Sequence, residues 1–272
     1  MQVDLENKVI RFVVQEYVNA IINFKSQAEL DFDTHKLIHT FQVVSVAQRL
    51  VDLALPKLSE KLVKQILNAA VLHDIGRCHE FKKGIQKKNF NHGEKGFELI
   101  SKKFSKLKKE YLTTRWHNRE PSASDPVEAQ PVLDYTRDAD MLGNLIYNTE
   151  HMSQFLAHIL QQFPNTSTGL MIDEEIVTAA LEKRNCRYSR MKKFDFLDMM
   201  LAQLAWLYNL RTKSGFKFAK KEKLFPRYRN VIISEVLPII PGTERQRQRA
   251  EKQIRELFPD AMFLEEFKKH GV

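Results

Sequence analysis

The chain has 272 residues, 43% of them apolar, which is enough for one large or two small globular domains with a proper core. Its 43 Lys and Arg residues outnumber its 34 Asp and Glu residues, and the formal net charge of +9 favours anionic partners. Two cysteines exclude a disulfide scaffold and a thiolate metal cage, and no apolar run has the length of a signal sequence or membrane span, so we expect a cytoplasmic protein without a membrane partner.

The first strongly periodic segments are predicted to be helical. Residues 9–22 form an apolar run interrupted by charged and amide side chains, which indicates an amphipathic helix. Residues 34–54 are predicted to form a second helix, in which His39 shares an inward face with Val43 at i+4. His35 lies on the same face and competes with His39, but it belongs to the first helical turn. We therefore expect His39 to point into a core.

A histidine and an aspartate are adjacent at the end of the next predicted helix, residues 59–75. Apolar residues at helical spacing lead up to His73 and Asp74, and Gly76 follows in the position of a helix-ending glycine. The imidazole and the carboxylate would then diverge from neighbouring backbone positions at an inward-facing helix end. Such a pair can hold one divalent cation or bridge two, because both side chains are ligands of transition metals.

Three further residues of ligand type follow along the chain. His92 opens a predicted helix, and His117 lies near a Pro- and Ser-rich loop at residues 121–131, which is placed to form a rim or lid. Asp140 lies in the predicted helix after this loop. Asp138 competes with it, but residues two apart on a helix point about 200° apart, so only one of the two can face a shared site.

The remainder of the chain is also predicted to be helical. After a break at residues 164–169, periodicity predicts helices at residues 173–184, 195–210, 226–237 and 242–258. Glycines and prolines are few, nine of each, and no segment alternates convincingly with period two. We therefore predict an all-α fold.

Five stretches, in order, resemble the HD superfamily of metal-dependent phosphohydrolases, whose signature is a helix histidine, a downstream His-Asp pair and a distal aspartate. The stretches are IHTFQVV (38–44), AAVLHDIGR (69–77), NHGEKGFELI (91–100), WHNRE (116–120) and RDADMLGNL (137–145). Their order is most similar to an HDIGR/DAD-type bacterial branch. The resemblance implies an HD-domain helical bundle at residues 1–162, with its core at about 30–150. It leaves residues 170–272 as an accessory helical region of unknown role.

The resemblance also implies a set of metal ligands. The signature positions, which would bind a first ion, are His39, His73, Asp74 and Asp140. Two additional histidines, His92 and His117, match branches with a second ion, in which the aspartate of the His-Asp pair bridges both. This donor set suits one or two divalent ions of Mn, Fe, Co, Ni, Mg or Zn. One departure concerns the substrate side: the branch usually carries a basic and an acidic residue after the DAD motif, where this chain has Met141 and Gly143.

Two segments carry most of the positive charge. Residues 81–119 hold 12 basic against three acidic residues, and residues 211–229 hold eight against one. The first segment brackets His92 and His117, so its field would concentrate an anionic small-molecule substrate, and a phosphorylated one fits best. Nucleic acid is an alternative partner, although no recognisable binding motif accompanies the charge. Nothing in the sequence indicates an oligomeric state.

Two cations are the best candidates for neutralising phosphate beside the catalytic carboxylate of Asp74. Arg77 directly follows the HDIG turn, and a guanidinium can grip two phosphate oxygens at once. Lys95 lies on the helix that His92 opens. Arg137 and Arg119 are second choices, and a helix-capping role for Arg77 is an equal alternative.

The expected function is that of a metal-dependent hydrolase in which a metal-activated water attacks the phosphorus of a nucleotide or a small phosphomonoester or phosphodiester. Two alternatives remain open. The six candidate ligands would also serve an HD-type diiron oxygenase. A noncatalytic protein could use the same pocket to bind a nucleotide for regulation.

Overall fold

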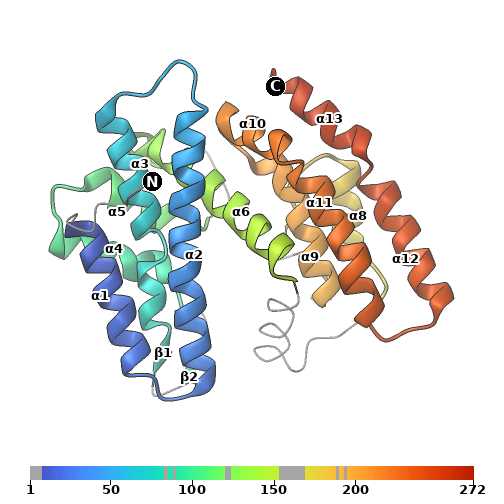
Figure 1. The fold of residues 1–272 in the computed structure, drawn as a ribbon, viewed down its shortest axis with the longest axis horizontal. Helices are drawn as coiled ribbons and strands as arrows, with labels where there is room; N and C mark the ends of the chain where they lie inside the picture. The colour runs from blue at the N-terminus through green and yellow to red at the C-terminus, as the bar shows by residue number, and fades with distance from the viewer. Residues whose placement is uncertain are drawn as a thin grey trace. The chain divides into compact units, whose positions relative to one another are not determined.

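The computed structural model of the chain describes residues 8–82, 85–87, 90–119, 124–152, 169–187, 190–192 and 195–272. The described chain is helical apart from one antiparallel hairpin of two-residue strands, β1 (Phe81–Lys82) and β2 (Ile85–Gln86), which confirms the all-α prediction (Figure 1). It separates into two compact units, Met1–Gly143 and Asn144–Val272. The predicted domain boundary at residue 162 and most of the predicted break at residues 164–169 lie outside the described residues.

The first unit is built from helices that hold the predicted site between them. In chain order they are α1 (Lys8–Ile22), α2 (Gln27–Asp52), α3 (Glu60–Leu72), the 3-10 helix η1 (Ile75–His79), α4 (His92–Lys103), α5 (Lys108–Trp116), the 3-10 helix η2 (Val127–Ala129) and α6 (Val132–Glu150), which continues into the second unit. The predicted helices of this part of the chain are present, but α2 begins at Gln27 and not at residue 34, so the prediction that His35 lies in the first helical turn is wrong.

Side-chain caps set where three of these helices begin. Ser26 accepts a hydrogen bond from the Glu29 amide at the start of α2, and Asn91 accepts one from the Glu94 amide at the start of α4. Ser59 caps α3 in the same way. Each cap satisfies an amide that would otherwise lack a partner in the first turn. The cap at Asn91 places His92 at the first position of α4.

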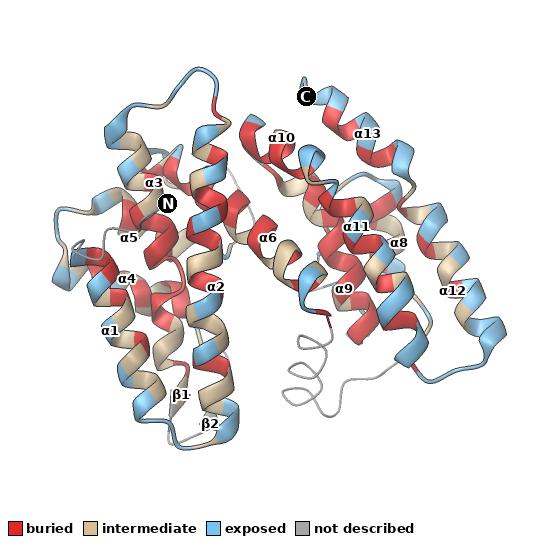
Figure 2. Cartoon of the chain, viewed as in Figure 1, coloured by how far each residue is buried: buried red, intermediate tan, exposed pale blue. Residues whose placement is uncertain are grey.

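The His-Asp turn is the most enclosed part of the first unit. Residues 68–76, which cover the last turn of α3 and the start of η1, are buried without interruption (Figure 2). Tyr17 of α1 is fully buried beneath this turn, and its hydroxyl donates a hydrogen bond to the backbone carbonyl of Asp74 at 3.0 Å. The turn therefore has a packed base and a fixed backbone.

The role predicted for Gly76 is wrong. Helix α3 ends at Leu72, and Gly76 lies inside η1 and does not adopt the left-handed conformation of a helix-ending glycine. It is needed for space instead, because a Cβ atom there would lie 2.0 Å from the carbonyl oxygen of His92. The absent side chain lets the start of α4 approach the His-Asp turn.

The position of Gly143, where the resembled branch usually has an acid, is a packing position. A Cβ atom at Gly143 would lie 3.3 Å from Cγ2 of Val43, so α6 approaches α2 closely here.

The second unit is a separate set of helices. Its elements are α8 (Glu174–Leu181), α9 (Phe196–Leu204), η4 (Ala205–Asn209), α10 (Lys213–Lys221), α11 (Leu224–Val231), the π-helical turn η5 (Ile232–Val236), η6 (Leu237–Ile239), α12 (Glu244–Leu257) and α13 (Asp260–Lys269). Helices α10 and α13 lie in segments for which no helix was predicted. No helix among the described residues combines the length and the apolar character needed to cross a membrane.

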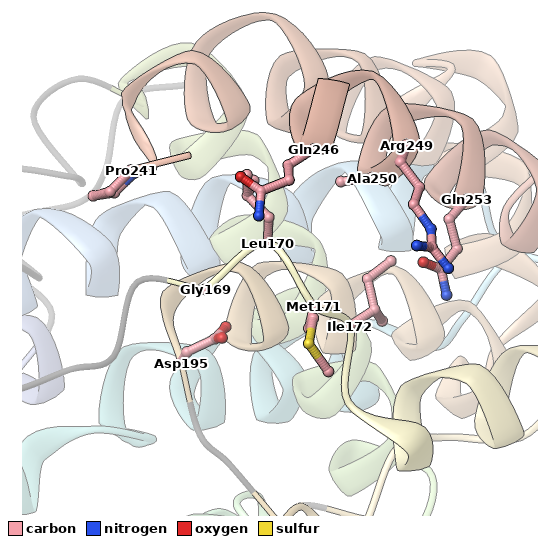
Figure 3. A pocket seen from close by; sticks show the side chains of 10 residues that line it. All are labelled: Gly169, Leu170, Met171, Ile172, Asp195, Pro241, Gln246, Arg249, Ala250 and Gln253. Carbon is pink, nitrogen blue, oxygen red and sulfur yellow. The ribbon is translucent and has the colours of Figure 1, made fainter. Parts of the chain in front are cut away.

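The second unit also has a pocket of about 630 Å³ beside α12, lined on one side by residues 169–172 (Figure 3). Its charged residues are Asp195 and Arg249. The Asp195 carboxylate already caps α9 by accepting from the Asp198 amide, and Gln246 of the pocket wall takes part in the capping box that begins α12. None of the predicted site residues lines this pocket, and much of its polar lining serves helix caps.

Candidate metal centre

The centre is organised by His73, which follows α3 as its C-cap. Its side chain is fully buried, and its Nδ1 lies 2.8 Å from the carbonyl oxygen of Ala70. A carbonyl can only accept, so Nδ1 carries the hydrogen. Burial lowers the pKa of His73 to about 4, which keeps the ring neutral near pH 7. Its Nε2 therefore presents a lone pair to the site.

One group of ligand atoms forms around this nitrogen. Nε2 of His73 lies 3.4 Å from Nε2 of His39, and the ligand atoms of His39, His73 and Asp74 all lie within 4.8 Å of one another. Asp140 adjoins this group, with Oδ1 at 3.0 Å from Nε2 of His39 and 3.8 Å from Nε2 of His73. The competing residue His35 stacks on His39 with ring centroids 6.4 Å apart and does not belong to the group.

A second group lies on the other side of Asp74. Its Oδ1 is 3.2 Å from Nε2 of His92 and 3.5 Å from Nε2 of His117, and the two imidazole nitrogens are 3.3 Å apart. His117 caps the C-terminus of α5, and its Nδ1 donates to the Thr114 carbonyl at 2.7 Å. His117 is thus held like His73, with Nδ1 bound to the carbonyl three residues earlier and Nε2 facing Asp74.

Asp74 belongs to both groups through different oxygen atoms. Oδ1 faces His92 and His117, whereas the contact to Nε2 of His73, at 3.8 Å, is made by Oδ2. A carboxylate whose two oxygens point at two sets of nitrogen ligands has the form of a bridging ligand between two cations.

The donor set fits divalent metal ions. Imidazole nitrogens face each other at 3.3 and 3.4 Å in buried surroundings, where two lone pairs repel unless a cation or a proton lies between them. Imidazole and carboxylate together suit Zn, Fe, Mn, Co and Ni. The backbone carbonyls that hold Nδ1 of His73 and His117 are the outer partners typical of metal-binding histidines.

The charges around the site keep its acid ionised. Burial by itself would raise the pKa of Asp74, but Lys36, His73 and Arg77 outweigh it and hold that pKa well below its usual range. Burial lowers the pKa of His92 well below its ordinary value. The site therefore offers an ionised carboxylate at Asp74 and neutral imidazoles at His73 and His92 near pH 7, which are the protonation states that a metal ion requires.

The cations predicted to meet the substrate have acidic partners of their own. Nη1 of Arg77 donates to Glu80 at 2.7 Å, and its Nε lies 3.5 Å from Oδ1 of Asp74. Lys95 pairs with Glu98 at 3.1 Å on the surface of α4.

Arg119 and Arg137, the second candidates for contacting phosphate, also form ion pairs with acidic residues. Arg119 pairs with Glu94 at 2.7 Å. Arg137 is buried, forms an ion pair with Asp125 and donates to two backbone carbonyls, those of Trp116 and Arg119. These contacts tie down the chain after α5.

Two polar residues beside the ligands were not predicted from the sequence. Lys36 lies one turn before His39 on α2, with Nζ 3.3 Å from Oδ2 of Asp74. Its i, i+3 spacing from a predicted inward histidine could have indicated it. Asn118, directly after His117, places Nδ2 3.3 Å from Nε2 of His92. Part of the predicted lid at residues 121–131, namely residues 121–123, lies outside the described residues.

A comparison with protein families agrees with this geometry. Residues 37–145 match the model of the HD domain family, and this range contains all six predicted ligands. No match was found among the curated proteins or the solved structures with which the chain was compared. This match at residues 37–145 is consistent with the HD superfamily, whose members are typically metal-dependent hydrolases. The more detailed placement in an HDIGR/DAD-type branch stays a prediction.

Proposed function

We propose that the protein is a metal-dependent hydrolase of a phosphate ester, with a nucleotide or another small phosphomonoester or phosphodiester as its substrate. The observation that supports this most is the position of Asp74, whose two oxygens face two separate groups of histidine nitrogens. A bridged pair of cation sites suits displacement at phosphorus, because both the attacking and the leaving oxygen can be stabilised. The HD domain supports the same class of reaction.

In this proposal one ion would be held by His39, His73, Asp74 and Asp140, and a second by Asp74, His92 and His117. Such ions supply hydroxide near neutral pH by lowering the pKa of water, and they polarise phosphoryl oxygens. The chain keeps the rings of His73 and His117 oriented through the Ala70 and Thr114 carbonyls. Asp74, which stays ionised, can accept a hydrogen bond from the attacking water and so orient it toward phosphorus.

The roles of the two proposed substrate cations differ. Arg77 is held by Glu80 and lies beside Asp74, so we assign it to positioning that carboxylate. Lys95 is 30% exposed on α4 and contributes to the positive field at the rim.

The test is a screen of nucleotides, cyclic nucleotides, sugar phosphates and a generic phosphate ester, with protein freed of metal by chelator and reloaded with Mn, Co, Ni, Mg, Fe or Zn. We expect release of phosphate or of a nucleoside monophosphate with at least one metal. Asp74→Asn should lower kcat/KM by about a thousandfold or more, because it removes the shared anionic ligand. His35→Ala is the matched control and should keep full activity. Hydrolysis that is independent of Asp74 would contradict the proposal.

Two groups of candidate ligands that share Asp74, with Asp140 beside the first group, also support a second candidate, a dinuclear iron oxygenase. Anaerobic loading with ferrous iron, followed by oxygen, separates the two functions. Oxygen consumption coupled to oxidation of an added polyol or phosphonate, with no phosphate ester cleaved under any metal, would favour the oxygenase.

A further inference from the structure

Lys36 differs from the other cations near the centre in the acid with which it pairs. Arg77, Lys95 and Arg119 each have a carboxylate that is not a predicted ligand, that of Glu80, Glu98 or Glu94, although Nε of Arg77 also lies 3.5 Å from Oδ1 of Asp74. In the part of the chain that the structure describes, the acid that forms an ion pair with Lys36 is Asp74 itself, at 3.3 Å from Nζ to Oδ2. The ammonium group therefore uses the oxygen that faces His73.

This pairing competes with a metal ion. If Oδ2 of Asp74 bound a divalent ion while it still contacted the Lys36 ammonium group, the ion and the ammonium group would repel each other strongly. Lysine has a flexible four-carbon stem, so Nζ can move away from Asp74 while the backbone of α2 stays in place. Arg77 has less freedom, because Glu80 holds its guanidinium at 2.7 Å.

The exposure of Lys36 determines whether its ammonium group can contact a molecule that enters from solvent. The side chain of Lys36 is 16% exposed, whereas that of Asp74 is 4% exposed and that of His73 is fully buried. The side chain of Lys36 thus reaches from the buried ligand Asp74 to the solvent, as does that of the proposed ligand Asp140, which is 23% exposed. An ammonium at that point is a strong hydrogen-bond donor to phosphoryl oxygens.

We propose that Lys36 is a substrate-binding residue that exchanges partners: its ammonium group leaves Asp74 when a divalent cation binds there and then binds a phosphoryl oxygen of the substrate. The chemical class of the ligand rests on the proposed function. The contact between Lys36 and Asp74 places this ammonium group beside the proposed centre before the exchange.

The experiment measures two binding reactions for which turnover is not needed. Lys36→Met keeps the stem without the charge, Lys36→Arg keeps the charge, and Lys64→Met on the exposed surface of α3 is the matched control. Calorimetry gives the dissociation constant for Mn²⁺ and, with loaded protein, for inorganic phosphate. We expect Lys36→Met to bind Mn²⁺ at least as tightly as the wild type and phosphate at least tenfold more weakly. Lys36→Arg should restore part of the phosphate affinity, and Lys64→Met should change neither constant.

Two outcomes would overturn the inference. Unchanged phosphate affinity in Lys36→Met shows that the ammonium does not meet the anion. Loss of Mn²⁺ binding in Lys36→Met shows instead that Lys36 supports Asp74 structurally. If this variant does not fold, Lys36→Gln, which keeps a donor to Asp74 without the charge, answers the same two questions. Phosphate binding that depends on Lys36, without hydrolysis of any ester, would contradict the proposed hydrolase and leave the role of Lys36 standing.

Discussion

At the scale of single residues, the two histidines that end helices are held alike. His73 and His117 each donate Nδ1–H to the carbonyl three residues earlier, at 2.8 and 2.7 Å, and each turns Nε2 toward Asp74. The chain thus builds the same local ligand geometry twice, once at the end of α3 and once at the end of α5. The two groups are expected to bind metal by the same chemistry.

This repetition leads to a prediction on stoichiometry. His117→Ala should lower the metal content of fully loaded protein from about two ions per chain toward one, because it removes a ligand of one group only. His73→Ala should reduce binding in the other group, and His35→Ala should bind like the wild type. Elemental analysis after exchange into chelator-treated buffer measures the content. A single ion in fully loaded wild type would instead make His92 and His117 contacts to substrate or water.

The six candidate ligands could be selected because each lies in a stretch that resembles the HD superfamily, and the structure places them in two adjoining groups that share Asp74. The partners of the cations were not predicted. Glu80 lies only three residues after Arg77, so the pair between them is local. The contact between Lys36 and Asp74 depends instead on the packing of α2 beside the His-Asp turn, which no local motif records.

At the scale of elements, the close contact between η1 and α4 shapes the second group of ligands. Gly76→Ala would place a Cβ atom 2.0 Å from the carbonyl oxygen of His92, which is backbone and cannot rotate away. The first turn of α4 must then shift, and His92 with it. We expect about 3 kcal/mol lower free energy of unfolding and a weakened second metal site, with the first site retained.

Urea denaturation of the metal-free protein and metal titration measure these two effects. Gly143→Ala is the control, because its Cβ atom would meet the end of the Val43 side chain at 3.3 Å and needs a smaller adjustment. If Gly76→Ala had wild-type stability and two intact sites, the close approach of η1 and α4 would not be what positions His92.

Helix ends and short helices were harder to predict than the ligands. Helix α10 was not predicted, and Gly215 in its first turn is unfavourable for an isolated helix. It forms because Phe216 and Phe218 are buried in the second unit and Thr212 caps its start by accepting from the Gly215 amide at 2.9 Å. Tertiary packing and a cap together outweigh the local preference.

At the scale of the whole molecule, the two basic segments differ in what accompanies their positive charge. Glu94 and Glu98 each pair with two cations of the first segment, so part of its charge is compensated locally. In the second segment the aromatic residues Phe216, Phe218, Phe225 and Tyr228 are all buried. They cannot stack on nucleic-acid bases, so any nucleic-acid contact of this segment would rest on phosphates alone.

Both units also contain a buried acid that burial keeps protonated. Burial raises the pKa of Asp33, in the first unit, and of Asp198, in the second, to about 7 each. At Asp198 the neighbouring carboxylates of Asp195 and Asp173 act in the same direction, against a hydrogen bond from the Asp173 amide at 2.8 Å. Each unit therefore has a group that is more easily ionised when the chain is unfolded.

The sign of the resulting pH dependence follows from the proton count. Between pH 4 and pH 7, Asp198 is deprotonated in the unfolded chain and protonated in the folded chain. The stability that this group contributes therefore falls as the pH rises, and it is lost above pH 7. Asp198→Asn keeps the acceptor for the Asp173 amide and removes the ionisation. Relative to the wild type, the variant should gain roughly 2 to 3 kcal/mol in free energy of unfolding between pH 5 and pH 8, since each pKa unit is worth about 1.4 kcal/mol.

Urea denaturation of metal-free protein at several pH values measures this difference. Asp52→Asn, which replaces an exposed carboxylate on α2, is the control and should follow the wild type at every pH. A stability difference between Asp198→Asn and wild type that did not change with pH would show that Asp198 is ionised in the folded protein. Its Oδ2, which is buried without a hydrogen-bond partner among the described residues, would then need a cation or an ordered water beside it.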